Sequence, residues 1–214
     1  MTSPDYIVLR DFFEKVLGHY TSGKYYETLV EGKKVFFEKT GKIDDDDDEY
    51  ESRMIDFNEW YIFDFIPSKV NGPLMRHYIH HNDVGQEMAH AFGHVRQSLF
   101  EFKGKSLWGN FIFEDFLYGK KIKASKKTVL PNIIKGDLFL ARVINFKGDY
   151  HLLGSVVTLP RDARPIFKKS ARKVRKKNDM RDNEEFLLEV QRLKCKWKSY
   201  NHVDVKHIFK FSTT

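Results

Sequence analysis

The spacing of apolar residues along the chain changes once, close to Ser98. Before Ser98, apolar side chains recur every three to four residues, which is the period of a helix that buries one face. Gly41 and Pro67 interrupt this pattern, because glycine commonly ends helices and proline disfavours a helical residue before it. We therefore predict helices, one of them aromatic and buried, which we place at residues 4–20, 24–40, 57–65, 74–81 and 82–97.

From Ser98 to Pro160 the apolar residues alternate with polar ones, which is the period of a strand with one buried face. Glycine-containing turns separate these β-rich runs from one another. Five short strands within about sixty residues predict a small antiparallel barrel of the SH3-like or OB-like kind. A helical pattern returns from Asn183 to Tyr200. The expected fold class is therefore α+β, with N-terminal helices, a five-stranded barrel and a C-terminal helix.

The chain divides into four parts, which we expect to pack as one unit because no Gly/Ser linker or repeat separates them. The four parts are N-terminal helices (1–97), a barrel (98–160), a basic segment (161–182) and a C-terminal helix that packs back on the core (183–214). With 41% hydrophobic and 15% aromatic residues, the chain can bury such a core. Since no apolar run reaches bilayer length and the first residues lack a cleavable apolar leader, we expect neither a membrane span nor a signal peptide.

Two stretches of the sequence are similar to a known group of proteins. One is the string Phe57-x-Glu59-Trp60-x-x-x-Asp64, and the other runs from Ser98-Leu99-Phe100-Glu101 to Gly136-Asp137-x-x-x-Ala141-Arg142. Together with the order of elements, they resemble a group of uncharacterised bacterial proteins, some of which carry zinc-binding SEC-C tails. The resemblance extends over residues 1–160 and implies a shared fold. The chain has a basic segment and a helix where such a tail would stand, so the resemblance implies no zinc site and no activity.

Charge is distributed very unevenly along the chain. The formal net charge is +7, yet residues 161–214 hold 16 Lys and Arg against 7 Asp and Glu, so this last quarter carries all of the excess. Within it, the stretch from Arg161 to Lys177 has nine cations and one anion. Asymmetry of this kind is typical of proteins that bind polyanions.

The leading hypothesis is a non-enzymatic protein that binds nucleic acid through its phosphate backbone. A dense cluster of cations gains affinity by releasing the counterions condensed on phosphates, with no base being read. Phe111 and Phe113 could offer rings for base stacking, although their alternation fits a barrel core equally well. The cations expected to bind phosphate are Lys168, Lys169, Arg172, Lys173, Arg175, Lys176 and Lys177, with Lys121 and Lys123 extending the track along the barrel.

Other partners remain open. The basic segment could dock on an acidic protein, which would make the chain a protein-interaction module. An anionic membrane surface fits the basic segment less well, because that segment has little apolar face. The run of acids from Asp44 to Glu51 could screen the cations or act as a solubilising loop, and its spacing does not match a calcium-binding EF-hand.

Three residues, Glu87, His90 and His94, are the candidates for a metal site. At helical spacing they share one face, where a carboxylate and two imidazoles could hold zinc or iron. The H-E-x-x-H order is absent, however, and solvent exposure explains the polarity of that face. We therefore expect no metal and no cofactor, and a metal-dependent enzyme that uses this helix face is the less favoured alternative. No nucleophile, phosphate-binding or dinucleotide-binding motif indicates an enzyme.

Two carboxylates near the aromatic helix and the single cysteine also lead to expectations. Glu59 and Asp64 flank a hydrophobic helix, and we expect such carboxylates to cap a neighbouring helix or to pair with Arg76 or Arg142. Cys195 is the single cysteine, which excludes an internal disulfide and any multi-cysteine metal site. A reducing, cytoplasmic location is the expectation that follows.

Overall fold

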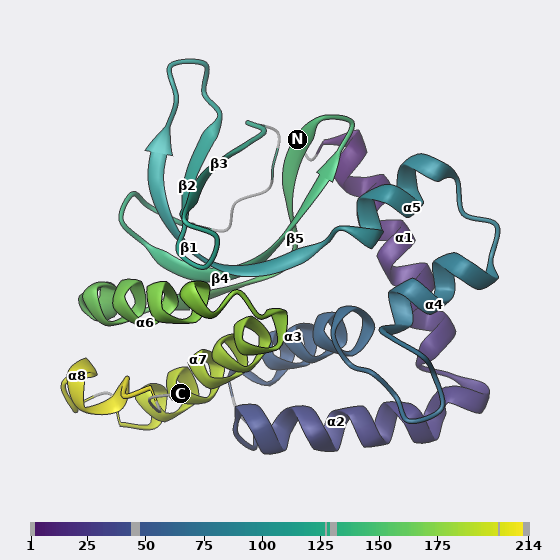
Figure 1. Cartoon of the computed structure of the whole chain (residues 1–214), viewed down its shortest axis with the longest axis horizontal. Helices are drawn as coiled ribbons and strands as arrows, with labels where there is room; N and C mark the ends of the chain where they lie inside the picture. Colours follow the sequence, from purple (N-terminus) through teal and green to yellow (C-terminus); the bar gives the residue numbers. More distant parts are fainter. Residues whose placement is uncertain (1–2, 44–47, 127, 129–131, 201, 212–214) are drawn as a thin grey trace.

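The computed structural model describes residues 3–43, 48–126, 128, 132–200 and 202–211, and its fold is α+β. Figure 1 shows a five-stranded sheet with α6 and α7 against one side and the N-terminal helices α1, α4 and α5 beside it. The helical part consists of α1 (Pro4–Tyr20), the short 3-10 helix η1 (Gly23–Tyr25), α2 (Tyr26–Thr40), α3 (Tyr50–Phe63), α4 (Leu74–His81) and α5 (Gln86–Gly93).

The sheet consists of β1 (Arg96–Lys105), β2 (Phe111–Asp115), β3 (Lys120–Ala124), β4 (Leu138–Phe146) and β5 (Asp149–Leu159). Hydrogen-bonded neighbours follow the order β1-β2-β3-β5-β4, and β4 pairs again with β1, so the sheet closes on itself. The strands match the five alternating runs of the sequence. Their alternation places Phe100, Phe113 and Phe139 inside the closed sheet, where each is fully buried.

The sheet is mixed, so the prediction that it is entirely antiparallel is wrong. β3 and β5 meet in parallel through one residue pair, Ala124 and Tyr150, while the other neighbouring strands are antiparallel. The reason is topological. Strand direction can alternate around a closed ring only when the number of strands is even, so a ring of five must contain one parallel contact.

Beyond the sheet, the chain continues through the 3-10 turn η2 (Arg161–Ala163), α6 (Arg164–Lys177), α7 (Met180–Ser199) and α8 (Val205–Ile208). The basic segment, to which the sequence assigned neither helix nor strand, is therefore mostly a helix. α7 packs on both α2 and α6 and so connects the helical part to the basic one. It begins three residues earlier than predicted, because Asp179 is its N-cap and accepts a hydrogen bond from the Arg181 N–H.

The helix predicted at residues 82–97 is much shorter in the structure. α5 spans only Gln86–Gly93, and β1 already begins at Arg96. Gly85, which precedes the helix, has an extended backbone, and the backbone of His94, which follows the helix, is no longer helical. The helices over 4–20 and 74–81 are confirmed at both ends. In the part of the chain that the structure describes, no helix is both long and apolar enough to cross a membrane.

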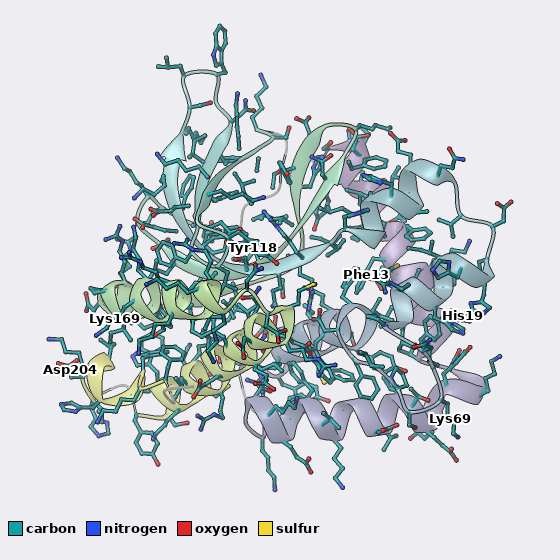
Figure 2. All side chains as sticks on the ribbon, viewed as in Figure 1. Phe13, His19, Lys69, Tyr118, Lys169 and Asp204 are labelled. Carbon is teal, nitrogen blue, oxygen red and sulfur yellow. The ribbon has the colours of Figure 1, made fainter. Side chains whose placement is uncertain are left out.

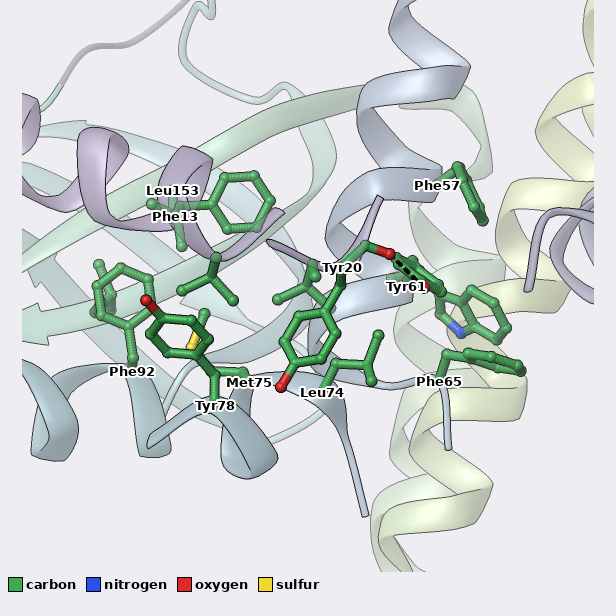
Figure 3. Packing of buried hydrophobic residues seen from close by; sticks show 14 of the residues in the cluster. Phe13, Tyr20, Phe57, Tyr61, Phe65, Leu74, Met75, Tyr78, Phe92 and Leu153 are labelled. Atoms are coloured by element: carbon green, nitrogen blue, oxygen red, sulfur yellow. Dashed lines mark hydrogen bonds between the residues drawn. The ribbon is translucent and has the colours of Figure 1, made fainter. Parts of the chain in front are cut away.

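A second apolar cluster joins the N-terminal helices to the outside of β4 and β5. Figure 3 shows Leu153 of β5 beside Phe13, in a cluster that extends through Tyr20 to Tyr61. The Tyr61 hydroxyl donates to the Tyr20 carbonyl oxygen, which satisfies two polar groups inside this cluster. A third cluster, formed by the sheet, α6, α7 and α8, fixes the position of the basic helix.

Candidate functional site

The helix α6 is anchored by a narrow apolar face. Phe167 and Ala171, one turn apart, are fully buried, and Ile166 and Val174 pack beside them. The Phe167 ring contacts the Phe209 ring edge-on at 5.0 Å between centroids. Pro165 in the first turn and left-handed Asn178 at the C-cap set the ends of the helix. This face holds α6 against the sheet and turns its remaining positions to solvent.

The cations predicted to bind phosphate are all exposed on the remaining faces of α6. They are Lys168, Lys169, Arg172, Lys173, Arg175, Lys176 and Lys177. Lys169, Lys173 and Lys176 follow one another at helical spacing, and Figure 2 marks Lys169 on this helix. Lys168, Arg172 and Arg175 form a second row, on the side facing the sheet. The structure thus brings the predicted cations of the basic segment together on one element.

Carboxylates neutralise part of this charge. Lys168 Nζ lies 2.7 Å from Glu114 Oε1 on β2, and the bond to Lys168 is the main cause that lowers the pKa of Glu114. Lys177 lies 3.5 Å from Asp182 of α7. Among the described residues, no ion pair forms at Lys169, Arg172, Lys173 or Lys176. The unpaired charge is therefore concentrated in the middle and last turns of α6.

A groove separates the second row of α6 cations from the β2–β3 turn. Phe116 and Gly119 of the turn form one wall, and Pro165, Arg172 and Arg175 line the other. A Cβ at Gly119 would meet the Arg175 guanidinium, which is the movable end of an exposed side chain. Glycine is favoured at this position because its φ is +65°.

Tyr118, in the same turn, lies between the sheet and the C-terminal helices (Figure 2). The Arg96 guanidinium stacks 4.3 Å from its ring centroid. Burial is the main cause that raises the pKa of Tyr118. This contact connects the β2–β3 turn to β1.

The second predicted basic stretch adjoins the first through Glu114. Lys121 and Lys123 are exposed on β3, and Lys121 lies directly across from Glu114 in the β2–β3 register. Glu114 therefore has Lys168 on one side and Lys121 on the other. The cations of α6 and β3 are neighbours on one surface, with a carboxylate at their junction.

The aromatic residues suggested for base stacking belong mainly to the core. Phe113 is fully buried among Phe100, Phe102 and Phe139. Phe111 is half-buried and packs against Phe102, with 6.0 Å between ring centroids. Strand alternation, which the sequence already displayed, places Phe113 inside the closed sheet, so it offers no surface for a base.

The candidate metal residues do not form a ligand set. His94 lies beyond the end of α5, its Nδ1 atom is 2.7 Å from the His90 carbonyl oxygen, and the two imidazole rings are 4.4 Å apart. In the described ranges, no group of three or more His, Cys, Asp or Glu residues is arranged to hold a metal ion. Because α5 stops at Gly93, the continuous helical face assumed for Glu87, His90 and His94 does not exist.

The described end of the acidic run contacts α7 and not the basic helix, whose cations it could have screened. Residues 44–47 lie outside the described part of the chain, but Glu49, at the start of α3, pairs with Lys194 at 2.8 Å and Lys198 at 3.3 Å. Both lysines belong to α7. The described end of the run therefore neutralises α7 rather than α6.

Glu59 and Asp64 share a single buried cation. Of the two arginines proposed as partners, Arg142 of β4 is the one in place: it is 1% exposed and forms ion pairs with both carboxylates. Burial raises the pKa of Glu59 to about 8. Arg142 and Glu59 are buried, and Asp64 is partly exposed, so this cluster connects α3 to β4 of the sheet.

The comparisons with known proteins give no independent identification, since no protein-family model, curated protein or solved structure matches this chain.

Proposed function

We propose that this protein binds nucleic acid through the phosphate backbone, with α6 as the contact surface and without reading the base sequence. The observation that carries the proposal is the set of four exposed and unpaired cations, Lys169, Arg172, Lys173 and Lys176, on two successive turns. Helical rise separates the first and last of them by about 10 Å, the axial length of roughly three phosphates on one strand. Backbone contact of this kind supplies affinity but no sequence code.

The sheet supports the same function. Lys121 and Lys123 continue the cationic surface from α6 along β3. Small closed sheets of the SH3-like or OB-like kind are common scaffolds for nucleic-acid binding, and we assign this sheet to that kind as part of the proposal. The groove between α6 and the β2–β3 turn then guides the backbone between the two sets of cations.

The test is a salt titration of binding to a fluorescent random-sequence oligonucleotide. The wild type is expected to lose affinity steeply as salt rises, because each neutralised phosphate releases counterions. Replacing Lys169, Arg172, Lys173 and Lys176 together by alanine should lower the slope of log K against log salt by about 3. Circular dichroism checks that the variant keeps its helices.

A matched control removes the same charge elsewhere. Lys15, Lys33, Lys34 and Lys39 are exposed on α1 and α2, and their joint replacement by alanine leaves α6 untouched. The control should keep a slope close to that of the wild type. The proposal is wrong if the two quadruple variants behave alike, or if the wild type binds the oligonucleotide with no dependence on salt.

A further inference from the structure

The β1–β2 hairpin ends in a tight and well-formed turn. The Ser106 N–H donates to the Asn110 carbonyl oxygen at 2.7 Å, and the Gly109 N–H donates to the Ser106 carbonyl oxygen at 2.9 Å. Gly109 takes a φ of +81°, which glycine adopts readily. Figure 1 shows that this hairpin projects away from the rest of the molecule. The turn is thus a defined tip on a stiff support.

The tip presents two large apolar side chains to solvent. Leu107 is fully exposed and Trp108 is 79% exposed. Turns of this kind normally carry small polar residues, and an exposed Leu–Trp pair leaves a large apolar area in contact with water. By contrast, Trp60 is buried and Trp197 is half-buried. An apolar pair held at the most prominent point of a hairpin fits a partner that accepts apolar groups.

Lysines surround this apolar tip. Lys105 precedes the turn and lies over the Phe111 ring at 5.3 Å, and Lys126 is tied to the hairpin because its N–H donates to Asn110 Oδ1 at 3.2 Å. Both lysines are exposed. The sequence has no acidic residue at positions 102–113 or 116–136. The partner of the tip must therefore combine an apolar interior with negative charge at its surface.

We propose that the β1–β2 tip docks on an anionic lipid bilayer, with Leu107 and Trp108 entering the interfacial layer and Lys105 and Lys126 contacting headgroups. Tryptophan is enriched at the boundary between lipid tails and headgroups, because its ring is apolar and its N–H is polar. Lysine near an anionic leaflet gains from the surface potential and can keep its ammonium in water while its stem is buried. The contact is peripheral, and it needs both the apolar pair and the lysines.

The tip and α6 occupy opposite ends of the same hairpin. β2 runs from the tip to the turn that lines the α6 groove, and its five residues extend about 17 Å. A bilayer bound at the tip therefore leaves α6 accessible. The inference does not depend on nucleic-acid binding, and either can fail without the other.

The experiment is co-sedimentation of the full chain with vesicles of phosphatidylcholine plus phosphatidylserine, compared with vesicles of phosphatidylcholine alone. The wild type should bind the anionic vesicles more tightly, and its tryptophan emission should shift to the blue, a shift that the variant without Trp108 should lose. Replacing Leu107→Ser and Trp108→Ser together should weaken binding by at least about tenfold. Since neither side chain is buried, the double variant should fold normally.

Two control variants test whether the apolar pair and the lysines of the tip are responsible for vesicle binding. Met180→Ser removes another exposed apolar side chain, 81% exposed on α7, and should leave vesicle binding unchanged. Lys105→Glu with Lys126→Glu should abolish the preference for anionic vesicles. The proposal is overturned if the wild type binds neither type of vesicle, or if the Leu107/Trp108 variant binds as the wild type does. It is also overturned if the oligonucleotide, rather than vesicles, requires Trp108, because the ring would then stack on bases.

Discussion

Gly154 of β5 lies against the carboxylate of Glu59 from α3, so closely that a Cβ at residue 154 would be 1.9 Å from Glu59 Oε1. The β4–β5 register shifts between Ala141 and Arg142, and this bulge leaves Gly154 and Ser155 outside the regular pairing. The Ser155 N–H, released from the strand ladder, donates to Glu59 Oε1 instead. The bulge therefore joins the helical part of the chain to the sheet.

Gly154→Ala is expected to destabilise the protein by about 2–4 kcal/mol, because the added methyl group displaces the Glu59 carboxylate and leaves buried polar groups unpaired. Urea unfolding followed by circular dichroism measures the change. The control is Gly148→Ala, which shares a positive φ but has no neighbour within 4 Å of its Cβ. This control should lose only about 1 kcal/mol, from backbone strain. Equal losses in both variants would contradict the assigned role of the Glu59 contact.

The raised pKa of Glu59 predicts how the free energy of unfolding depends on pH. Arg142 is surrounded by the carboxylates of Asp64, Glu59 and Asp56, and burial of Glu59 raises its pKa from 4.5 to about 8. Between pH 4.5 and pH about 8, Glu59 keeps its proton in the native protein but has lost it in the unfolded chain. The free energy of unfolding therefore falls as pH rises through this range. Glu59→Gln cannot titrate. The wild type should therefore lose stability relative to the variant from pH about 5 to pH 8 in urea melts, and parallel curves would refute the assignment.

The strands were predictable because each is an apolar, β-rich run bounded by turn residues, and β3 also alternates between exposed and buried positions. Phe139, Ala141 and Val143 fall on one face of β4 and all three are buried inside the sheet. Closure of the sheet was expected, and a closed ring of five strands already requires one parallel contact, which the all-antiparallel prediction overlooked. The place of that contact, Ala124 with Tyr150, depends on the order in which distant strands pair, and no local pattern in the sequence records that order.

The sequence predicted that the cations of the basic segment are exposed, but it did not predict that the segment is a helix. With nine cations between Arg161 and Lys177, the sequence led to no helix being predicted there, yet Phe167 and Ala171 stand one helical turn apart and are fully buried. That spacing was present in the sequence, where the charge around it obscured it. The Lys168–Glu114 ion pair had no such indication, because it joins residues of two elements that only the folded chain brings together.

This ion pair leads to a prediction on the binding surface. Since Glu114 already neutralises Lys168, Lys168→Gln should reduce the salt dependence of oligonucleotide binding less than Lys173→Gln, which should lower the slope by about 0.7–0.9. Glu114→Gln should strengthen binding, because it releases Lys168 and removes a carboxylate beside Lys121. The same salt titration measures all three variants. Equal slopes for Lys168→Gln and Lys173→Gln would show that the ion pair does not persist in solution.

The last prediction concerns the buried face of α6. A substitution there distinguishes a basic helix docked on the sheet from a basic segment that is flexible. Phe167 is fully buried between the sheet, α7 and the Phe209 ring, so Phe167→Ala should cost about 3–5 kcal/mol of unfolding free energy. Lys173→Ala, on the exposed side of the same helix, should change it by less than about 0.5 kcal/mol. Urea unfolding measures both. If Phe167→Ala costs no more than Lys173→Ala, α6 is not docked, and its cations have no fixed surface on which to meet phosphates.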